Sequence, residues 1–184
     1  MAGLALRHDV VDGARGDALT AAIDACDLSP FRFQGWLGRR LTASFGWEYD
    51  FDAARMVAGP PIPPWLLDLR GDVAGRLGLD AAAFEQALVI RYDPGAGIGW
   101  HRDRPHYGRV VGLSLGAPAT LWLRRRRPAG GFDRAAVPLR PRSAYLLDGE
   151  VRSGWEHSIA PLDATRWSVT FRTLSELGRR AFRA

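Results

Sequence analysis

The first third of the chain carries apolar residues at helical spacing. Leu19, Ile23 and Cys26 recur every three or four positions, which predicts an amphipathic helix over residues 17–28. A second helix is predicted over residues 65–77, where apolar residues share one face, two prolines precede the first turn and a glycine follows the last. We expect both helices to pack on the outside of the protein, because each also has a polar face.

From residue 86 onward the pattern changes to short apolar stretches separated by glycine and proline, which is typical of strands joined by turns. The predicted strands cover residues 87–92, 110–115, 120–126, 137–139, 143–147, 157–160 and 166–173. We expect the strands at 110–115 and 120–126 to be neighbours, joined through Gly116 and Pro118. Short strands at this spacing predict a mainly β fold with flanking helices, built as a barrel or a two-sheet jelly roll.

The composition fits one compact domain. The chain has 184 residues, of which 47% are hydrophobic and 24% charged, so it can form a core and is not disordered. The longest mainly apolar run, residues 110–123, is too short and too mixed to span a bilayer, and the first residues lack the apolar centre of a secretion signal. Cys26 is the only cysteine, which excludes an internal disulfide. We therefore expect a monomeric, cytoplasmic protein that does not enter a membrane.

The charge permits a nucleic-acid partner without requiring one. The formal net charge is +5, which favours contact with a polyanion. The sequence contains no lysine, however, so all 25 basic residues are arginines. This bias, together with abundant alanine and glycine, is what a GC-rich coding sequence also produces.

Two histidines and an aspartate form the pattern with the clearest chemistry. His101 and Asp103 are two residues apart, and on an extended strand such residues point to the same side, with Cα atoms about 6.7 Å apart. His157 lies far downstream and must arrive from another strand. Two imidazoles and one carboxylate on one face are the ligand set of non-haem Fe(II) oxygenases. Alone, a His-x-Asp pair is common by chance, so this interpretation depends on what accompanies it.

The last predicted strand carries two arginines on one face. Arg166 and Arg172 are six positions apart, an even number, so both point the same way, together with Ser168. Buried unpaired charge is costly, so inward-pointing guanidinium groups need anions. One interpretation is a pair of salt bridges to buried acids such as Asp103 or Asp148. The other is a dicarboxylate ligand gripped by the guanidinium fork.

The order of these residues resembles the AlkB family of Fe(II)- and 2-oxoglutarate-dependent dioxygenases. The resemblance extends to the Tyr-x-Pro-Gly turn at residues 92–95, the strand at 111–116 and the Gly-Glu-x-Arg segment at 149–152, and it covers about residues 39–174. It implies a double-stranded β-helix (jelly-roll) core over about 86–174, preceded by a helical and lid region over about 1–85. The whole chain, 1–184, would form a single domain of this kind.

The resemblance also implies roles for individual residues. The Fe(II) ligands would be His101, Asp103 and His157, and the contacts to 2-oxoglutarate would come from Tyr92, Arg166, Ser168 and Arg172. Two positions depart from the family pattern: Ile90 and Ser168 stand where asparagine is usual. The implied reaction consumes O2 and 2-oxoglutarate and gives succinate and CO2, and an N-methyl group oxidised in this way is lost as formaldehyde.

An aromatic-rich segment is the candidate substrate region. Residues 31–51 are rich in aromatic side chains with interleaved arginines, which suits a stacked single-stranded or flipped base, and in the family this region forms a nucleotide-recognition lid. The plain alternative is that the alternating aromatics at 45–51 are the core face of a strand. The candidate substrate contacts are Arg39, Arg40, Phe45, Trp47, Tyr49, Pro105 and His106. Pro105 stands where nucleobase demethylases often carry an acidic residue. The arginine run at 124–127 either holds phosphates or is a solvated turn.

Three functions remain open at the level of the sequence. The leading one is oxidative demethylation of N-alkylated bases in DNA or RNA, as in repair of alkylation damage. The second is hydroxylation or demethylation of a protein side chain by the same chemistry. The third is a non-catalytic nucleic-acid-binding module, which the complete His-Asp-His set and both arginines argue against. Zinc hydrolysis would leave the two arginines without a purpose.

Overall fold

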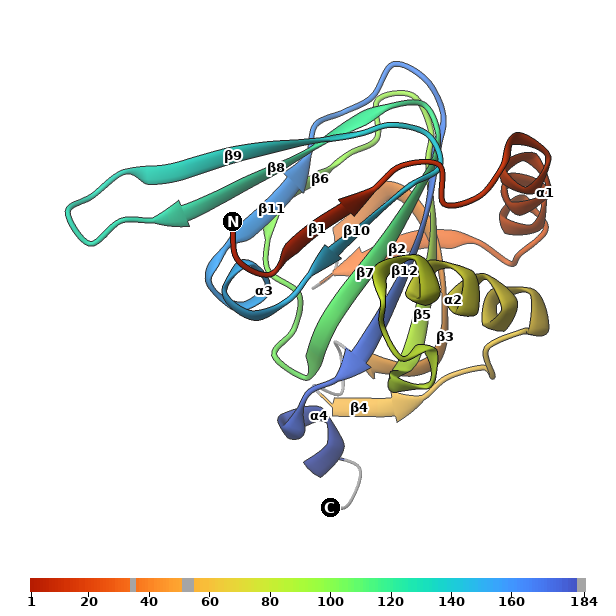
Figure 1. Ribbon diagram of the computed structural model, residues 1–184, viewed down its shortest axis with the longest axis horizontal. Coiled ribbons are helices and arrows are strands. Elements are labelled where there is room, and N and C mark those ends of the chain that lie inside the picture. Colours follow the sequence, from red (N-terminus) through yellow and green to blue (C-terminus); the bar gives the residue numbers. More distant parts are fainter. Residues whose placement is uncertain (34–35, 51–54, 182–184) are drawn as a thin grey trace.

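The computed structural model describes residues 1–33, 36–50 and 55–181, and of residues 32, 33, 36 and 37 it describes the backbone (Figure 1). The helices are α1 (Gly13–Asp24), α2 (Pro64–Leu77), α3 (Gly149–Gly154) and α4 (Glu176–Arg180), with a 3-10 turn at Ala81–Ala83. The strands are β1 (Leu4–Arg7), β2 (Ser29–Phe33), β3 (Trp36–Asp50), β4 (Arg55–Ala58), β5 (Phe84–Tyr92), β6 (Ile98–His101), β7 (Tyr107–Gly116), β8 (Ala119–Arg126), β9 (Phe132–Leu139), β10 (Ser143–Leu147), β11 (Glu156–Ile159) and β12 (Arg166–Leu174).

The strands form two antiparallel sheets, which confirms the predicted jelly roll. The larger sheet has the order β1-β10-β7-β12-β5-β3-β2, with β4 added beside β3, and the smaller one has the order β6-β11-β8-β9. The helices α1 and α2 cover the outer face of the larger sheet (Figure 1). Their apolar residues, such as Ile23 and Leu69, form one core with residues of that face, including Leu113 of β7. A second core, around Leu121 and Leu147, lies between the sheets.

The predicted helices are present, and the first is displaced along the chain. The second helix begins one residue earlier than predicted and ends as expected, because Gly78 adopts a left-handed conformation with φ 69°. The first helix begins and ends about four residues before the predicted range. Asp12 sets its start, since its side chain accepts a hydrogen bond from the backbone N–H of Arg15 at 2.7 Å. Cys26 therefore lies beyond the helix, although it still packs against the core.

One predicted strand pairing is wrong. All the predicted strands exist, but β7 belongs to the larger sheet and β8 to the smaller one, so these two are neighbours only in sequence. At the end of β7, Gly116 has φ +72°, and the chain crosses there from one sheet to the other. Such crossings let consecutive strands line opposite walls of one cavity.

Among the described residues, no helix is long and apolar enough to cross a membrane.

A glycine in β7 makes room for an aromatic ring between the sheets. Gly112 lies opposite Tyr145 of β10, and a Cβ atom at this position would overlap the tyrosine ring. We predict that Gly112→Ala lowers the free energy of unfolding by about 1–3 kcal/mol, because the ring or the strand must move. Thermal or urea denaturation measures the change.

The matched control for this substitution is Gly71→Ala. Gly71 lies on the exposed side of α2, where an added Cβ meets nothing within 4 Å. This substitution is expected to leave stability unchanged or to raise it by up to about 1 kcal/mol, because alanine favours helix. Equal effects of the two substitutions would contradict the assignment of Gly112 as a site of close approach.

Candidate active site

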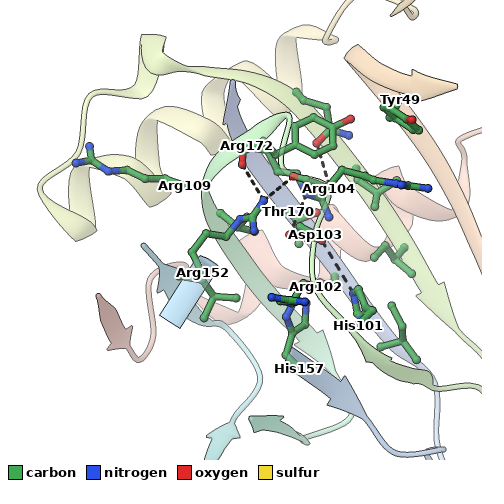
Figure 2. A pocket seen from close by; sticks show the side chains of 18 of the residues that line it. Tyr49, His101, Arg102, Asp103, Arg104, Arg109, Arg152, His157, Thr170 and Arg172 are labelled. Atoms are coloured by element: carbon green, nitrogen blue, oxygen red, sulfur yellow. Dashed lines mark hydrogen bonds and ion pairs between the residues drawn. The ribbon is translucent and has the colours of Figure 1, made fainter. Parts of the chain in front are cut away.

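The structure brings His101, Asp103 and His157 together at the edge of the smaller sheet that β6 forms. His101 ends β6 and lies directly opposite His157 of β11, and the two rings are 4.2 Å apart between centroids. Asp103 lies two residues past the end of β6, in the following turn rather than on the strand. The ligand atoms of the three side chains are all within 4.8 Å of one another. Figure 2 shows them converging on one side of the cavity.

The protonation states of these groups suit a divalent metal. Burial lowers the pKa of His157 to about 3 and also lowers the pKa of His101, so both imidazoles are neutral near pH 7. Burial alone would raise the pKa of Asp103, but Arg172 and the two histidines outweigh it and hold that pKa well below its usual range. The Nδ1 atom of His101 lies 2.9 Å from the carbonyl oxygen of Gly99, which directs Nε2 toward the other ligands. Two neutral nitrogen donors and one carboxylate oxygen are a donor set that fits Fe(II).

The sequence left two interpretations open for the arginines of β12, an internal salt bridge or a bound dicarboxylate. In the structure Arg172 fits the first interpretation and Arg166 fits the second. Arg172 forms the buried salt bridge: its Nε lies 3.4 Å from Oδ2 of Asp103, and its Nη1 donates to Oε1 of Gln86 at 2.9 Å. The opposing charge of Asp103 raises the pKa of Arg172 although burial alone would lower it. Asp148, the other proposed partner, instead pairs with Arg109 at 2.8 Å.

Arg166 has no anion of its own among the described side chains. Its side chain is 0% exposed, and its Nε donates to the hydroxyl of Ser114 at 3.0 Å. Both terminal nitrogens are buried without a hydrogen-bond partner in the part of the chain that the structure describes. The guanidinium lies 5.0 Å over the ring of Tyr92. A buried guanidinium with a free fork is costly unless a ligand meets it, and a carboxylate fits the fork with two parallel hydrogen bonds.

A cavity of about 1900 Å³ joins these groups. It is lined by the His-Asp-His set, by both arginines of β12, and between them by Ser168, which is 2% exposed. Tyr145 also lines it, and burial raises the pKa of this phenol to about 12, so its hydroxyl stays protonated. The sequence analysis missed Tyr145, Ser114 and Gln86. Only the sheet register identifies them, because all three lie on other strands from the arginines that they accompany.

The predicted substrate contacts separate into two groups. Arg40, Tyr49 and Pro105 line the cavity. Phe45 packs against the core, Arg39 is exposed, and Trp47 and His106 are not among the lining residues. The side chains of Phe33 and Trp36, and all of Phe51, lie outside the described residues.

The strict alternation expected from 45 to 51 fails at Gly46. This residue has φ +79°, and β3 changes its partner there from β5 to β4. Residues before the glycine keep one phase, so Phe45 faces the core, whereas Tyr49 beyond it faces the cavity. The left-handed backbone conformation at Gly46 interrupts the alternation of side chains along the strand.

Arg152 positions the turn that carries Asp103. It lies on α3, in the Gly-Glu-x-Arg segment, and its Nη2 donates to the carbonyl oxygens of Arg104 and Tyr107, both at 2.7 Å. The turn is therefore tied to the helix that leads to His157. The segment was noted in the sequence only as part of a motif, and its physical role appears with the tertiary structure.

The arginine run at 124–127 mostly forms ion pairs. Arg124 pairs with Glu156 at 2.6 Å and Arg125 with Asp133 at 3.0 Å, which fastens β8 to its neighbours β11 and β9. Arg127 lies 3.8 Å from Asp133. The run is on the hairpin that extends away from the body of the protein in Figure 1. Its pairing favours the structural interpretation over a free phosphate-binding tip.

Comparison with known proteins identifies the family. The family model of the 2OG-Fe(II) oxygenase superfamily matches residues 37–179. The uncharacterized protein L905 of Acanthamoeba polyphaga mimivirus is 31% identical over 49% of this chain and 48% of its own length. The tRNA (carboxymethyluridine(34)-5-O)-methyltransferase ALKBH8 of Mus musculus is 24% identical over 86% of this chain. The structure of OsALKBH1 has the same fold, with a TM-score of 0.67, 16% identity and coverage of 93% of this chain and 96% of that one.

The chain belongs to the 2OG-Fe(II) oxygenase superfamily, and its resemblance to AlkB is confirmed. It spans about half the length of the viral relative and about a quarter of the mouse relative. As a domain of this class, it is a 2-oxoglutarate-dependent dioxygenase that uses Fe(II), 2-oxoglutarate and O2.

Replacing Arg152 tests how the Asp103 turn is held. We predict that Arg152→Met lowers the affinity for Mn(II), used as a stable substitute for Fe(II), by about 10–100-fold, because the turn loses two hydrogen bonds that orient a ligand. Isothermal titration calorimetry measures the affinity, and thermal denaturation checks folding.

The control is Arg142→Met, which removes a partly exposed arginine that pairs with Asp9 at 2.9 Å, away from the cavity. Its metal affinity should match that of the unmodified protein. An unchanged affinity in folded Arg152→Met would show that Arg152 does not position the turn.

Proposed function

We propose that this protein oxidatively removes N-alkyl groups from nucleobases in DNA or RNA, as in the repair of alkylation damage. In this proposal His101, Asp103 and His157 hold Fe(II). When bound, Fe(II) and 2-oxoglutarate together use O2 to hydroxylate a C–H bond, with release of succinate and CO2, and a hydroxylated N-methyl group leaves as formaldehyde. The residues of the chain bind, orient and enclose the reactants.

Each cavity residue has a physical task in this scheme. Arg166 binds the distal carboxylate of 2-oxoglutarate, which its two unpartnered nitrogens support. Tyr92 and Ser168 line the path between that carboxylate and the metal. Arg172 holds one oxygen of Asp103 and keeps the carboxylate ionised, which leaves the other oxygen for the metal.

A nucleic-acid substrate is supported by one observation above all: the mouth of the cavity combines arginines with aromatic rings. The guanidinium of Arg104 lies 4.6 Å over the ring of Tyr49, and both residues line the cavity. His106, which does not line it, packs behind the same tyrosine with its ring 5.0 Å away. Arg102, Arg104 and Arg109 also line the cavity (Figure 2). Such a rim suits phosphates and bases together, and a stacked base contributes about 1–3 kcal/mol. The mouse relative, named for a tRNA modification, agrees with this class of substrate.

We also propose that residues 1–85 and 86–174 act as one domain. The helices α1 and α2 pack on the sheet that carries Arg166 and Arg172, and β3 extends the same sheet to the cavity mouth. The N-terminal region therefore supplies both support for the site and one of its walls.

The central test is formaldehyde release. With Fe(II), ascorbate and 2-oxoglutarate, the protein should release formaldehyde from oligonucleotides that carry N-methylated bases and not from methylated peptides. His101→Ala should abolish release because it removes a metal ligand, while binding of the oligonucleotide persists. Release from peptides alone would favour the protein-modifying alternative, and the absence of any succinate would favour a non-catalytic binder.

A second prediction concerns the cosubstrate. Arg166→Ala should raise the KM for 2-oxoglutarate at least about tenfold, since hydrogen bonds to a charged group are worth about 1.5–3 kcal/mol. Steady-state succinate formation measures KM, with Arg142→Met as the control of unchanged KM. If folded Arg166→Ala keeps its KM for 2-oxoglutarate, then another residue binds the distal carboxylate.

A further inference from the structure

Six arginines line the cavity in addition to the two on β12. One of the six is Arg40 of β3, whose guanidinium lies 4.0 Å from the centre of the Phe31 ring. Its Nε is buried with no hydrogen-bond partner, and Arg40 takes part in no ion pair among the described residues. Burial lowers its pKa, although a guanidinium remains charged near pH 7.

The sheet register places Arg40 beside the metal and cosubstrate groups. Arg166 of β12 pairs with Tyr92 of β5, and Leu41 of β3 pairs with Arg91 of β5. Arg40 thus continues the row of Arg166 and Tyr92 one strand farther on. Its charge reaches the candidate metal ligands: after burial, which is the main cause, Arg40 helps to lower the pKa of His101.

The two arginines of β12 each have an anionic partner. Arg172 forms an ion pair with Asp103, and in the proposed function Arg166 binds the distal carboxylate of 2-oxoglutarate. The acids Glu48 and Asp50 also line the cavity, but they lie beyond Gly46, where β3 changes its partner strand, and neither forms an ion pair with Arg40 among the described residues. Pro105 offers no carboxylate near the metal.

Of the other lining arginines, Arg109 and Arg179 form ion pairs and Arg152 donates to backbone carbonyl oxygens. Arg40 has no such partner among the described residues, so its guanidinium is available to a substrate.

A partly buried cation selects among alkylated bases by charge. N1-Methyladenine and N3-methylcytosine are cations near pH 7, whereas N1-methylguanine and N3-methyluracil are neutral and carry a carbonyl oxygen in place of the amino group. Like charges in a poorly solvated site repel, and a guanidinium donates readily to a carbonyl oxygen. We propose that Arg40 is a specificity-determining residue that binds an oxygen acceptor of a neutral or anionic base and disfavours cationic alkylated bases. This inference deepens the proposed function and depends on it for the reaction.

The experiment compares these four bases in otherwise identical single-stranded oligonucleotides. Binding to the metal-free protein is measured by fluorescence anisotropy, and formaldehyde release is measured with the loaded enzyme. The unmodified protein should favour N3-methyluracil over N3-methylcytosine, and N1-methylguanine over N1-methyladenine, by at least about tenfold in binding and in kcat/KM. Arg40→Gln should reduce this preference, Arg40→Glu should reverse it, and Arg40→Lys should keep much of it.

Arg76→Gln is the control, because Arg76 is an exposed residue in the last turn of α2 and is not among the residues that line the cavity. It should leave the preference unchanged, and thermal denaturation verifies that each variant is folded. An equal or opposite preference in the unmodified protein, or a preference that does not change in Arg40→Glu, would overturn the inference.

The remaining outcomes separate the inference from the proposed function. An Arg40-dependent binding preference without formaldehyde release would support the role of Arg40 and overturn the proposed reaction. A rise in the KM for 2-oxoglutarate that is equal for all four bases would assign Arg40 to the cosubstrate and overturn the inference. Failure of the protein to bind any of the oligonucleotides would overturn both.

Discussion

The site depends on the cost of burying charge between two sheets. The side chains of Arg172 and Asp103 are both largely buried, and each is tolerable there only because the other is within 3.4 Å. The pair occupies one carboxylate oxygen and keeps the group ionised against the effect of burial. The same burial keeps the two histidines neutral, so the three candidate ligands reach the state that a metal needs before any metal binds.

The larger sheet distributes its cations with a regular geometry. Arg166 and Arg172 are separated by an even number of residues on β12, and Arg40 enters from β3 through the register with β5. Of these three arginines, Arg172 has an acid, Arg166 has no partner for its terminal nitrogens among the described residues, and Arg40 faces a ring with its Nε unpaired. The apolar faces of α1 and α2 pack on the outer side of the sheet, so polar side chains are concentrated on the cavity side.

The differences between prediction and structure have local physical causes. The first helix is displaced because Asp12 caps it earlier than its apolar periodicity indicates. Period-2 reasoning placed Asp103 on a strand with His101, but β6 ends at His101, and a turn held by Arg152 brings the carboxylate back to the metal side. Gly46 interrupts the alternation of side chains along β3, so Phe45 packs against the core whereas Tyr49 lines the cavity.

By itself the sequence predicted seven of the strands and the second helix, because these depend on periodicity along the chain. The His-Asp-His set came from the resemblance to AlkB, and the structure brings its three side chains together. The sequence also determined that Arg166 and Arg172 share a face, since strand geometry fixes that relation. Only the tertiary structure decided which arginine has an internal partner, which strands belong to which sheet, that Tyr145 enters the cavity, and that Arg40 rather than Arg39 lines it. These outcomes depend on register between strands distant in sequence, and no local pattern of side chains encodes that register.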